Sequence, residues 1–238
     1  MDRRHSPLIS GLLLAALLSW ACGSSQLRDT AISADRQSQL RLSDGHSRVA
    51  SLAELLGPYQ ATVLVFWSAG CPCVRRYQAR SDELVARLQP RGIQVLGVAS
   101  NADEAPADIE KARQERGIAL PIWRDRGGLL AQELGVKTTP TVVVLLADGR
   151  VAYTGWIDNE RLPGDPKRQA WLDQALERIS AGDLTPSRKP TWGCRITQGT
   201  PEDELAPSST QPSAEPNPSS CGCKAQPAPA NSGGVTTP

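Results

Sequence analysis

The chain lacks several features that mark common functional classes. Its 26 basic and 25 acidic residues leave a net charge of +1, so charge gives no reason to expect nucleic-acid binding. It has only two histidines, His5 and His46, and His5 lies in an N-terminal segment with the pattern of an export signal. A histidine-based metal centre or a Cys-His catalytic pair would therefore have to use His46. The sequence contains no glycine-rich dinucleotide fingerprint, and hence implies no organic cofactor.

The segment 1–22 predicts export. Arg3 and Arg4 give it a basic start, and the apolar run Leu8–Leu18 leads through small residues to Cys22. This run is shorter than the about 20 apolar residues that a bilayer-spanning helix needs. The stretch LLSWACGSS resembles a bacterial lipoprotein signal, which predicts lipidation of Cys22 and anchoring to a membrane; an ordinary cleaved signal is the alternative. Both readings place the protein in the bacterial periplasm or cell envelope, where disulfides persist.

Composition and periodicity divide the remaining chain into four parts. Residues 23–36 are expected to be a polar tether without apolar periodicity, and residues 37–182 one globular domain. Residues 183–197 are a short C-terminal extension, and residues 198–238 are a disordered tail rich in Pro, Ser, Thr, Gln and Ala. The extension contains Cys194, and the tail contains the step Cys221-Gly222-Cys223.

The domain alternates strands with helices. Short runs rich in β-branched residues predict strands at Val63–Trp67, Ile93–Val98, Leu120–Trp123, Thr141–Leu146 and Val151–Trp156. Helical periodicity and boundary residues predict helices at Cys71–Leu88, Pro106–Arg116, Leu129–Leu134 and Trp171–Ile179. Ser51 and Glu54 have the spacing of a capping box at the start of a further helix. Strands that alternate with helices and then close on a β-hairpin predict an α/β domain with a mixed sheet.

The segment Thr62–Val74, TVLVFWSAGCPCV, carries the candidate chemistry. A buried strand ends at Trp67 and brings Cys71 to the start of a helix, where Pro72 occupies the first position. Unpaired N–H groups and the helix dipole stabilise a thiolate placed there. Arg75, about one helical turn further on, could lower the pKa of the thiol further. Cys71 is therefore the candidate nucleophile.

The stretch Phe66–Pro72, FWSAGCP, resembles the active-site entry of the thioredoxin-like superfamily. Within it the closest resemblance is to the redoxin branch, which includes alkyl hydroperoxide reductase/thiol-specific antioxidant proteins and TlpA-like oxidoreductases. Over roughly residues 37–182 this implies a thioredoxin-like fold with a central mixed β-sheet flanked by helices. The family spaces its paired cysteines C-P-x-C, positions that here hold Cys71 and Val74. Cys73 stands between them, which argues against simple dithiol exchange of the thioredoxin kind.

A second segment, Gly135–Leu146, contains Thr139-Pro140, which matches the family's cis-proline loop. The resemblance implies a cis bond there, with the backbone before Pro140 beside the sulfur of Cys71 and paired with the substrate chain. The family resemblance thereby implies an extracytoplasmic thiol–disulfide oxidoreductase that acts on protein disulfides or thiols. The thiol that donates electrons to it is not identified by the sequence.

Two residues could resolve a disulfide or sulfenate on Cys71. Cys73 is nearest, but a disulfide across one intervening residue closes a small, strained and labile ring. Cys194 lies in TWGCRI, just beyond the last predicted helix, and that segment resembles the ending of relatives that carry C-P-C sites. Both alternatives stay open from sequence.

Two other functions compete with thiol–disulfide exchange. Peroxiredoxins place Thr or Ser three residues before their peroxidatic cysteine, as Ser68 is here, but Leu64 stands where they have proline. The resemblance therefore leaves a thiol-dependent peroxidase as an alternative. The other alternative is a non-catalytic copper-binding module, in which the Cys71/Cys73 and Cys221/Cys223 pairs would share a soft ion such as Cu(I). Because the copper-assembly relatives use C-x-x-x-C with a histidine, redox chemistry is favoured and no metal ligands are assigned.

The remaining polar and aromatic motifs are interpreted structurally. The Trp residues 67, 123, 156 and 171 are expected in the core or lining the site. The charged segment Asp103–Arg116 is expected to be a surface helix, and Asp158–Arg161 a solvated loop.

Overall fold

The computed structural model describes residues 31–160 and 165–199. The expected export signal with Cys22 lies outside the described residues, as does the tail from residue 200 with Cys221 and Cys223. None of the helices in the described part is long and apolar enough to cross a membrane.

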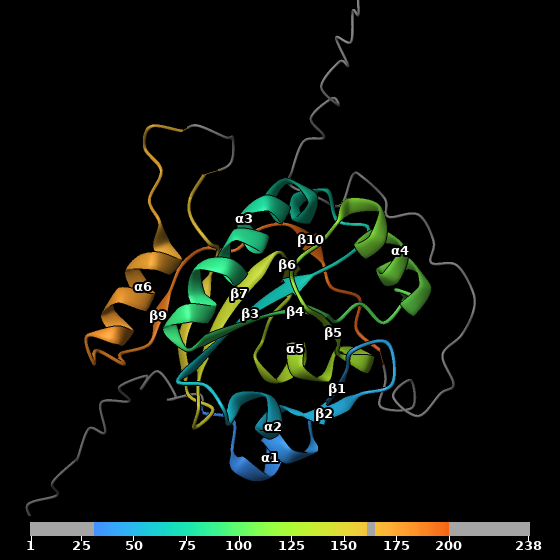
Figure 1. Cartoon of the computed structure of the whole chain (residues 1–238), viewed down its shortest axis with the longest axis horizontal. Helices are drawn as coiled ribbons and strands as arrows, with labels where there is room; N and C mark the ends of the chain where they lie inside the picture. The colour runs from blue at the N-terminus through green and yellow to red at the C-terminus, as the bar shows by residue number, and fades with distance from the viewer. Residues whose placement is uncertain (1–30, 161–164, 200–238) are drawn as a thin grey trace, which may run out of the picture.

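A mixed β-sheet forms the centre of the domain (Figure 1). In the described part of the chain it has eight strands in the order β2-β1-β5-β4-β3-β7-β8-β9. They are β1 (Arg41–Ser43), β2 (Val49–Ser51), β3 (Ala61–Trp67), β4 (Ile93–Ala99), β5 (Ile122–Arg124), β7 (Thr141–Leu146), β8 (Val151–Gly155) and β9 (Ser187–Arg188). β3 pairs parallel with β4 and antiparallel with β7. Every residue of β3 and β7 is buried, as expected for continuous apolar strands covered on both faces.

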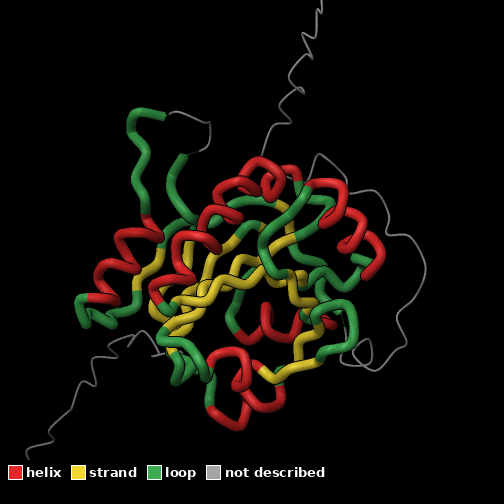
Figure 2. Tube along the Cα trace, viewed as in Figure 1, coloured by secondary structure: helices red, strands yellow, loops and turns green. Residues whose placement is uncertain are grey.

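Helices cover both faces of this sheet (Figure 2). The larger layer packs α3, α4 and α6 against one face, and the second packs α2 and α5 against the other. The helices are α1 (Ala34–Gln39), α2 (Leu52–Leu56), α3 (Pro72–Leu88), α4 (Pro106–Arg116), α5 (Leu129–Glu133) and α6 (Trp171–Ser180), with short 3-10 turns η1 (Gln89–Arg91) and η2 (Arg126–Gly128). The domain is thus α/β with a thioredoxin-like fold, which confirms the predicted class.

Local signals placed most element boundaries to within two residues. Ser51 caps α2, and its capping box with Glu54 is complete: the side chain of each accepts from the backbone of the other. α3 begins at Pro72 with Cys71 as its N-cap residue. The strand expected at Leu120–Trp123 instead runs from Ile122 to Arg124.

The prediction of a polar tether up to residue 36 is wrong for the described residues of that segment. Ala31 forms a β-bridge with Arg150, and Ile32 is buried while its N–H donates to the carbonyl of Gly149 at 3.1 Å. Ser33 then caps the short helix α1. A single buried apolar residue, a local cap and the ion pair of Arg36 with Glu133 at 2.8 Å hold this segment, and none of them produces the apolar periodicity that would reveal it in the sequence.

The C-terminal extension returns to the body of the domain. β9 pairs parallel with β8 at one end of the sheet. Further on, β10 (Cys194–Arg195) pairs antiparallel with β6 (Thr138–Thr139) in a separate two-stranded sheet. The N–H of Gly199 donates to the carbonyl of Gly127 at 3.2 Å, so residues 198 and 199 belong with the extension and not with the tail.

Candidate functional site

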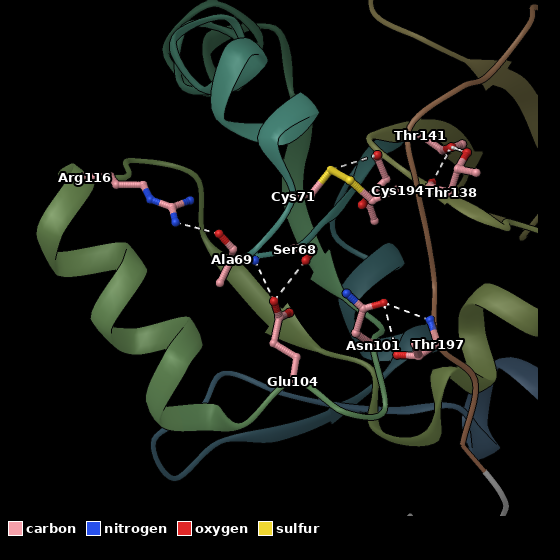
Figure 3. The surroundings of a disulfide bond; sticks show 11 residues. Ser68, Ala69, Cys71, Asn101, Glu104, Arg116, Thr138, Thr141, Cys194 and Thr197 are labelled. Carbon is pink, nitrogen blue, oxygen red and sulfur yellow. Dashed lines mark hydrogen bonds between the residues drawn. A yellow bond between two sulfur atoms is a disulfide. The ribbon is translucent and has the colours of Figure 1, made fainter. Parts of the chain in front are cut away.

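Cys71 lies where the central strand β3 passes into α3 (Figure 3). Its N–H donates to the carbonyl of Ser68 at 3.4 Å, which closes the turn between strand and helix. Pro72 occupies the first helical turn, so the missing N–H of proline costs no helical hydrogen bond. Cys71 is 1% exposed. A thiolate at this place would face the positive end of a 17-residue helix.

Cys71 forms a disulfide with Cys194, 123 residues further along the chain. The two Cα atoms are 6.0 Å apart, a usual separation for a disulfide. β10 brings Cys194 to this point by pairing with β6, in a register that sets Cys194 opposite Thr139. In this structure the bond is between Cys71 and Cys194, and the choice of resolving residue between Cys73 and Cys194 stays a prediction.

The peptide bond between Thr139 and Pro140 is cis, as the family resemblance implied. The carbonyl oxygen of Thr139 lies 3.3 Å from Sγ of Cys71. A disulfide sulfur carries no proton, so this is a contact in the oxidised state. A Cys71 thiol formed by reduction could donate a hydrogen bond to the same oxygen.

Cys73 is a third sulfur in the site. It is fully buried in the first turn of α3, and the sulfurs of Cys71, Cys73 and Cys194 all lie within 4.8 Å of one another. Three reduced thiolates so placed could hold a soft ion such as Cu(I). In the disulfide state two of these sulfurs are bonded to each other, so they do not form such a ligand set.

A buried carboxyl group, Glu104, supports the turn that leads to Cys71. One of its oxygens accepts from the hydroxyl of Ser68 at 3.0 Å and from the N–H of Ala69 at 2.6 Å. Burial raises the pKa of Glu104 to about 7, against the opposing effect of these hydrogen bonds. Sequence reasoning missed this residue, because Glu104 lies in a charged stretch expected on the surface, and it is 6% exposed.

Ser68 and Arg75, the two residues expected to support Cys71, differ in their surroundings. The Ser68 hydroxyl donates to Glu104, so the side chain supports the turn from the side of the carboxyl group. Arg75 is exposed, and another cation, Arg116, contacts the turn: its guanidinium donates to the carbonyl of Ala69 at 2.6 Å. Arg116 comes from the last turn of α4.

Aromatic side chains belong to the same core cluster as the disulfide. Trp192 lies over Trp156 with ring centroids 3.6 Å apart, and Trp156 meets Tyr77 edge-on at 4.8 Å. Trp67 is a core residue, 1% exposed, and its indole N–H donates to the side-chain oxygen of Gln78 at 3.2 Å.

The expectation of a solvated loop after β8 is wrong. Asp158 is fully buried and Glu160 is 4% exposed. The guanidinium of Arg80 on α3 donates to both carboxylate oxygens of Asp158 at 2.9 Å and also pairs with Glu160, and Arg168 pairs with Asp158 at 2.9 Å. Sequence gave no signal for this network, because its cations come from a distant helix and from the segment before α6.

The strand–cysteine–helix turn and the cis-proline loop both lie within a segment that matches a known family. A model of the AhpC/TSA family matches residues 34–154, just over half of the chain. The chain belongs to the AhpC/TSA family. The match ends before residue 194, so membership in AhpC/TSA by itself says nothing about Cys194.

Curated relatives of this chain bear the name thiol-disulfide oxidoreductase ResA, and two of them show the extent of the match. The protein from Halalkalibacterium halodurans is 25% identical over 116 residues, which cover 48% of this chain and 64% of the relative. The protein from Geobacillus thermodenitrificans is 29% identical over 110 residues, which cover 46% of this chain and 61% of the relative. The alignments thus span less than two thirds of these relatives' own length.

A solved structure supports the fold. The crystal structure of an uncharacterized conserved protein from Geobacillus kaustophilus superposes with a TM-score of 0.59 at 24% identity. The superposition covers 68% of this chain and 89% of that chain. This likeness concerns the fold alone.

Proposed function

We propose that the protein is an extracytoplasmic thiol–disulfide oxidoreductase in which Cys71 is the nucleophile and Cys194 its resolving partner. The observation that carries the proposal is the disulfide between Cys71, at the N-terminus of α3, and Cys194, held beside the cis-proline loop. The names of the curated relatives support the same class of reaction.

The reaction follows from the positions of the sulfurs. In the reduced protein the Cys71 thiolate attacks one sulfur of a substrate disulfide, which forms a mixed disulfide and releases the other substrate sulfur as a thiolate. The Cys194 thiolate then attacks Sγ of Cys71 and releases the second substrate thiolate. Two electrons have then passed to the substrate, and the protein holds the Cys71–Cys194 disulfide. An external thiol must reduce that bond for a second turnover, and the same steps in reverse would oxidise a dithiol.

Location outside the cytoplasm is part of the proposal. It is supported by the basic start, short apolar run and Cys22 of the N-terminal segment, and by a disulfide deep in the site. Cys22 is the proposed point of lipid attachment and hence of membrane anchoring. Protein disulfides or thiols are the proposed substrates.

A peroxidase would use the same sulfur but receives less support. The hydroxyl of Ser68, which would have to serve the peroxide, donates instead to Glu104 at 3.0 Å. Leu64, on β3, occupies the position where peroxiredoxins carry proline. Thiol–disulfide exchange is therefore the function that the geometry supports best.

The proposal is tested by turnover of a protein disulfide, such as that of insulin, with dithiothreitol as the electron donor. We expect Cys71→Ser to reduce turnover to the uncatalysed rate. The matched control replaces the tail cysteines, Cys221→Ser with Cys223→Ser, and should retain turnover of this model substrate. Activity that survives in Cys71→Ser would refute the assignment of the nucleophile.

A further inference from the structure

The edge of β6 next to Cys71 is occupied by a segment of the same chain. In the antiparallel pairing of β6 with β10, Cys194 lies opposite Thr139 and Arg195 opposite Thr138. The sulfur bonded to Cys194 is that of Cys71, which touches the carbonyl of Thr139. The segment Trp192–Ile196 therefore has the arrangement of a peptide joined to the nucleophile by a mixed disulfide (Figure 3).

Gly193, the residue immediately before this cysteine, makes the close approach possible. Its φ is 145°, a conformation that residues with a side chain rarely adopt. A Cβ atom at Gly193 would lie 2.8 Å from the carbonyl carbon of Thr139 and still closer to the carbonyl oxygen. The backbone against which the segment packs thus leaves no room for a side chain at the position before the cysteine.

The resident segment is held by a short pairing and by an anchor at each end. Trp192 packs with its ring tilted against Trp156 on one side. On the other side Ile196 is buried, and its N–H donates to the carbonyl of Lys137 at 3.0 Å. The strand itself is only two residues long. Reduction of the disulfide removes the covalent connection and leaves these weaker contacts to compete with another chain.

We infer that the β6 edge selects substrates with glycine directly before the reactive cysteine, and that such a substrate displaces Trp192–Ile196 from Thr138–Thr139. This inference rests on the proposed function and adds a substrate class to it. The substrate chain and the segment that carries Cys194 therefore pair with the β6 edge alternately, one at a time. Attack of Cys194 on the mixed disulfide is therefore coupled to the return of β10 and the departure of the substrate chain.

The chain supplies a sequence of the required kind for a probe. Gly222-Cys223 repeats the Gly-Cys step of Gly193-Cys194, in a part of the chain outside the described residues. A synthetic peptide of residues 219–227 with Cys221 replaced by serine contains one cysteine preceded by glycine. Its matched control differs only by alanine in place of that glycine. In both peptides the cysteine is activated as a mixed disulfide with thionitrobenzoate.

The test measures how fast each peptide reacts with the reduced full-length chain carrying Cys194→Ser, Cys221→Ser and Cys223→Ser. The Cys71 thiolate attacks the peptide sulfur, forms the protein–peptide disulfide and releases coloured thionitrobenzoate. The same chain with Cys71→Ser gives the background rate. We expect the glycine peptide to react at least about tenfold faster than the alanine peptide, in line with the usual cost of forcing a methyl group into packed structure.

The outcomes separate this inference from the proposed function. Equal Cys71-dependent rates for the two peptides would overturn glycine selectivity and leave the oxidoreductase proposal standing. Release that does not depend on Cys71 would overturn both.

A second measurement examines the resident segment itself. Gly193→Ala should lower the equilibrium constant for forming the Cys71–Cys194 disulfide in a glutathione buffer by about tenfold or more, because the methyl group meets Thr139. Gly182→Ala is the matched control: Gly182 also has positive φ, 85°, but a Cβ there meets nothing within 4 Å. Equal effects of the two substitutions would contradict the close approach at Gly193.

Discussion

The hydroxyl of Ser68 donates to the buried carboxyl group of Glu104, 36 residues further along the chain. This bond joins the loop after β4 to the turn that positions Cys71, because the same carboxyl oxygen also accepts from the N–H of Ala69. Glu104 therefore acts on the nucleophile through the backbone and is a positioning residue.

Glu104→Gln should change how stability depends on pH. A glutamate carboxyl group has a reference pKa of 4.5 in the unfolded chain, and burial raises the pKa of Glu104 to about 7 in the folded protein. Between these values the folded state holds a proton that the unfolded state has lost, so the free energy of unfolding falls as pH rises and levels off above about 7. Glutamine can keep both hydrogen bonds without ionising. We expect the variant to exceed the wild type in stability at pH 8, by up to about 3 kcal/mol, and to match it near pH 4.

Urea unfolding at a series of pH values measures this effect. Glu83→Gln is the control, because Glu83 is an exposed carboxylate on α3. A Glu104→Gln profile that parallels the wild type from pH 4 to pH 8 would show that burial does not shift this group.

The buried ion pairs predict unequal effects for two arginines of α3. Arg80→Met removes the cation that bonds both carboxylate oxygens of the fully buried Asp158 and leaves Arg168 as its remaining cation, which should cost about 1.5–3 kcal/mol of unfolding free energy. Arg87 pairs with Asp173 at 2.7 Å but both side chains are partly exposed, so Arg87→Met should cost at most about 1 kcal/mol. Chemical denaturation of both variants gives the comparison. Similar losses would mean that the Asp158 network contributes no more than a surface pair.

Trp192→Ala should loosen the segment that carries Cys194. Loss of the contact with Trp156 should shift the Cys71–Cys194 exchange equilibrium toward the reduced form by about three- to tenfold. Arg195→Ala is the control, since the Arg195 side chain lies in the same strand but is exposed. The equilibrium is read by alkylation and mass spectrometry in glutathione buffers. If both variants matched the wild type, Trp192 would not anchor the segment.

Two cysteine variants distinguish the possible resolving residues. With Cys194→Ser, a mixed disulfide between Cys71 and substrate should accumulate, because the sulfur that resolves it is gone. With Cys73→Ser, the Cys71–Cys194 disulfide should still form. Non-reducing electrophoresis with peptide mapping detects both species. Accumulation of the mixed disulfide in Cys73→Ser but not in Cys194→Ser would assign resolution to Cys73.

Much of the fold was predictable because its signals are local. The apolar run of β3, the capping box at Ser51 and the proline after Cys71 each depend on residues close in sequence. The cis-proline loop was predictable from the family resemblance. These features place the nucleophile and the loop that faces it.

The rest depends on pairings between distant residues. In the sequence Glu104 cannot be distinguished from a charged surface residue, because its hydrogen bond with Ser68 forms only in the folded protein. Asp158 is likewise a core residue because Arg80, distant in the sequence, pairs with it. The sequence could not choose between Cys73 and Cys194, because that choice depends on whether β10 pairs with β6. No local pattern encodes these contacts.

The most direct test of the proposed redox pair is a disulfide map of the full chain across a graded glutathione buffer, with alkylation and mass spectrometry at each step. We expect Cys71 and Cys194 to gain and lose one shared disulfide together, as a reversible pair. A Cys71 that stays reduced throughout, or that pairs with Cys73 while Cys194 stays free, would contradict it.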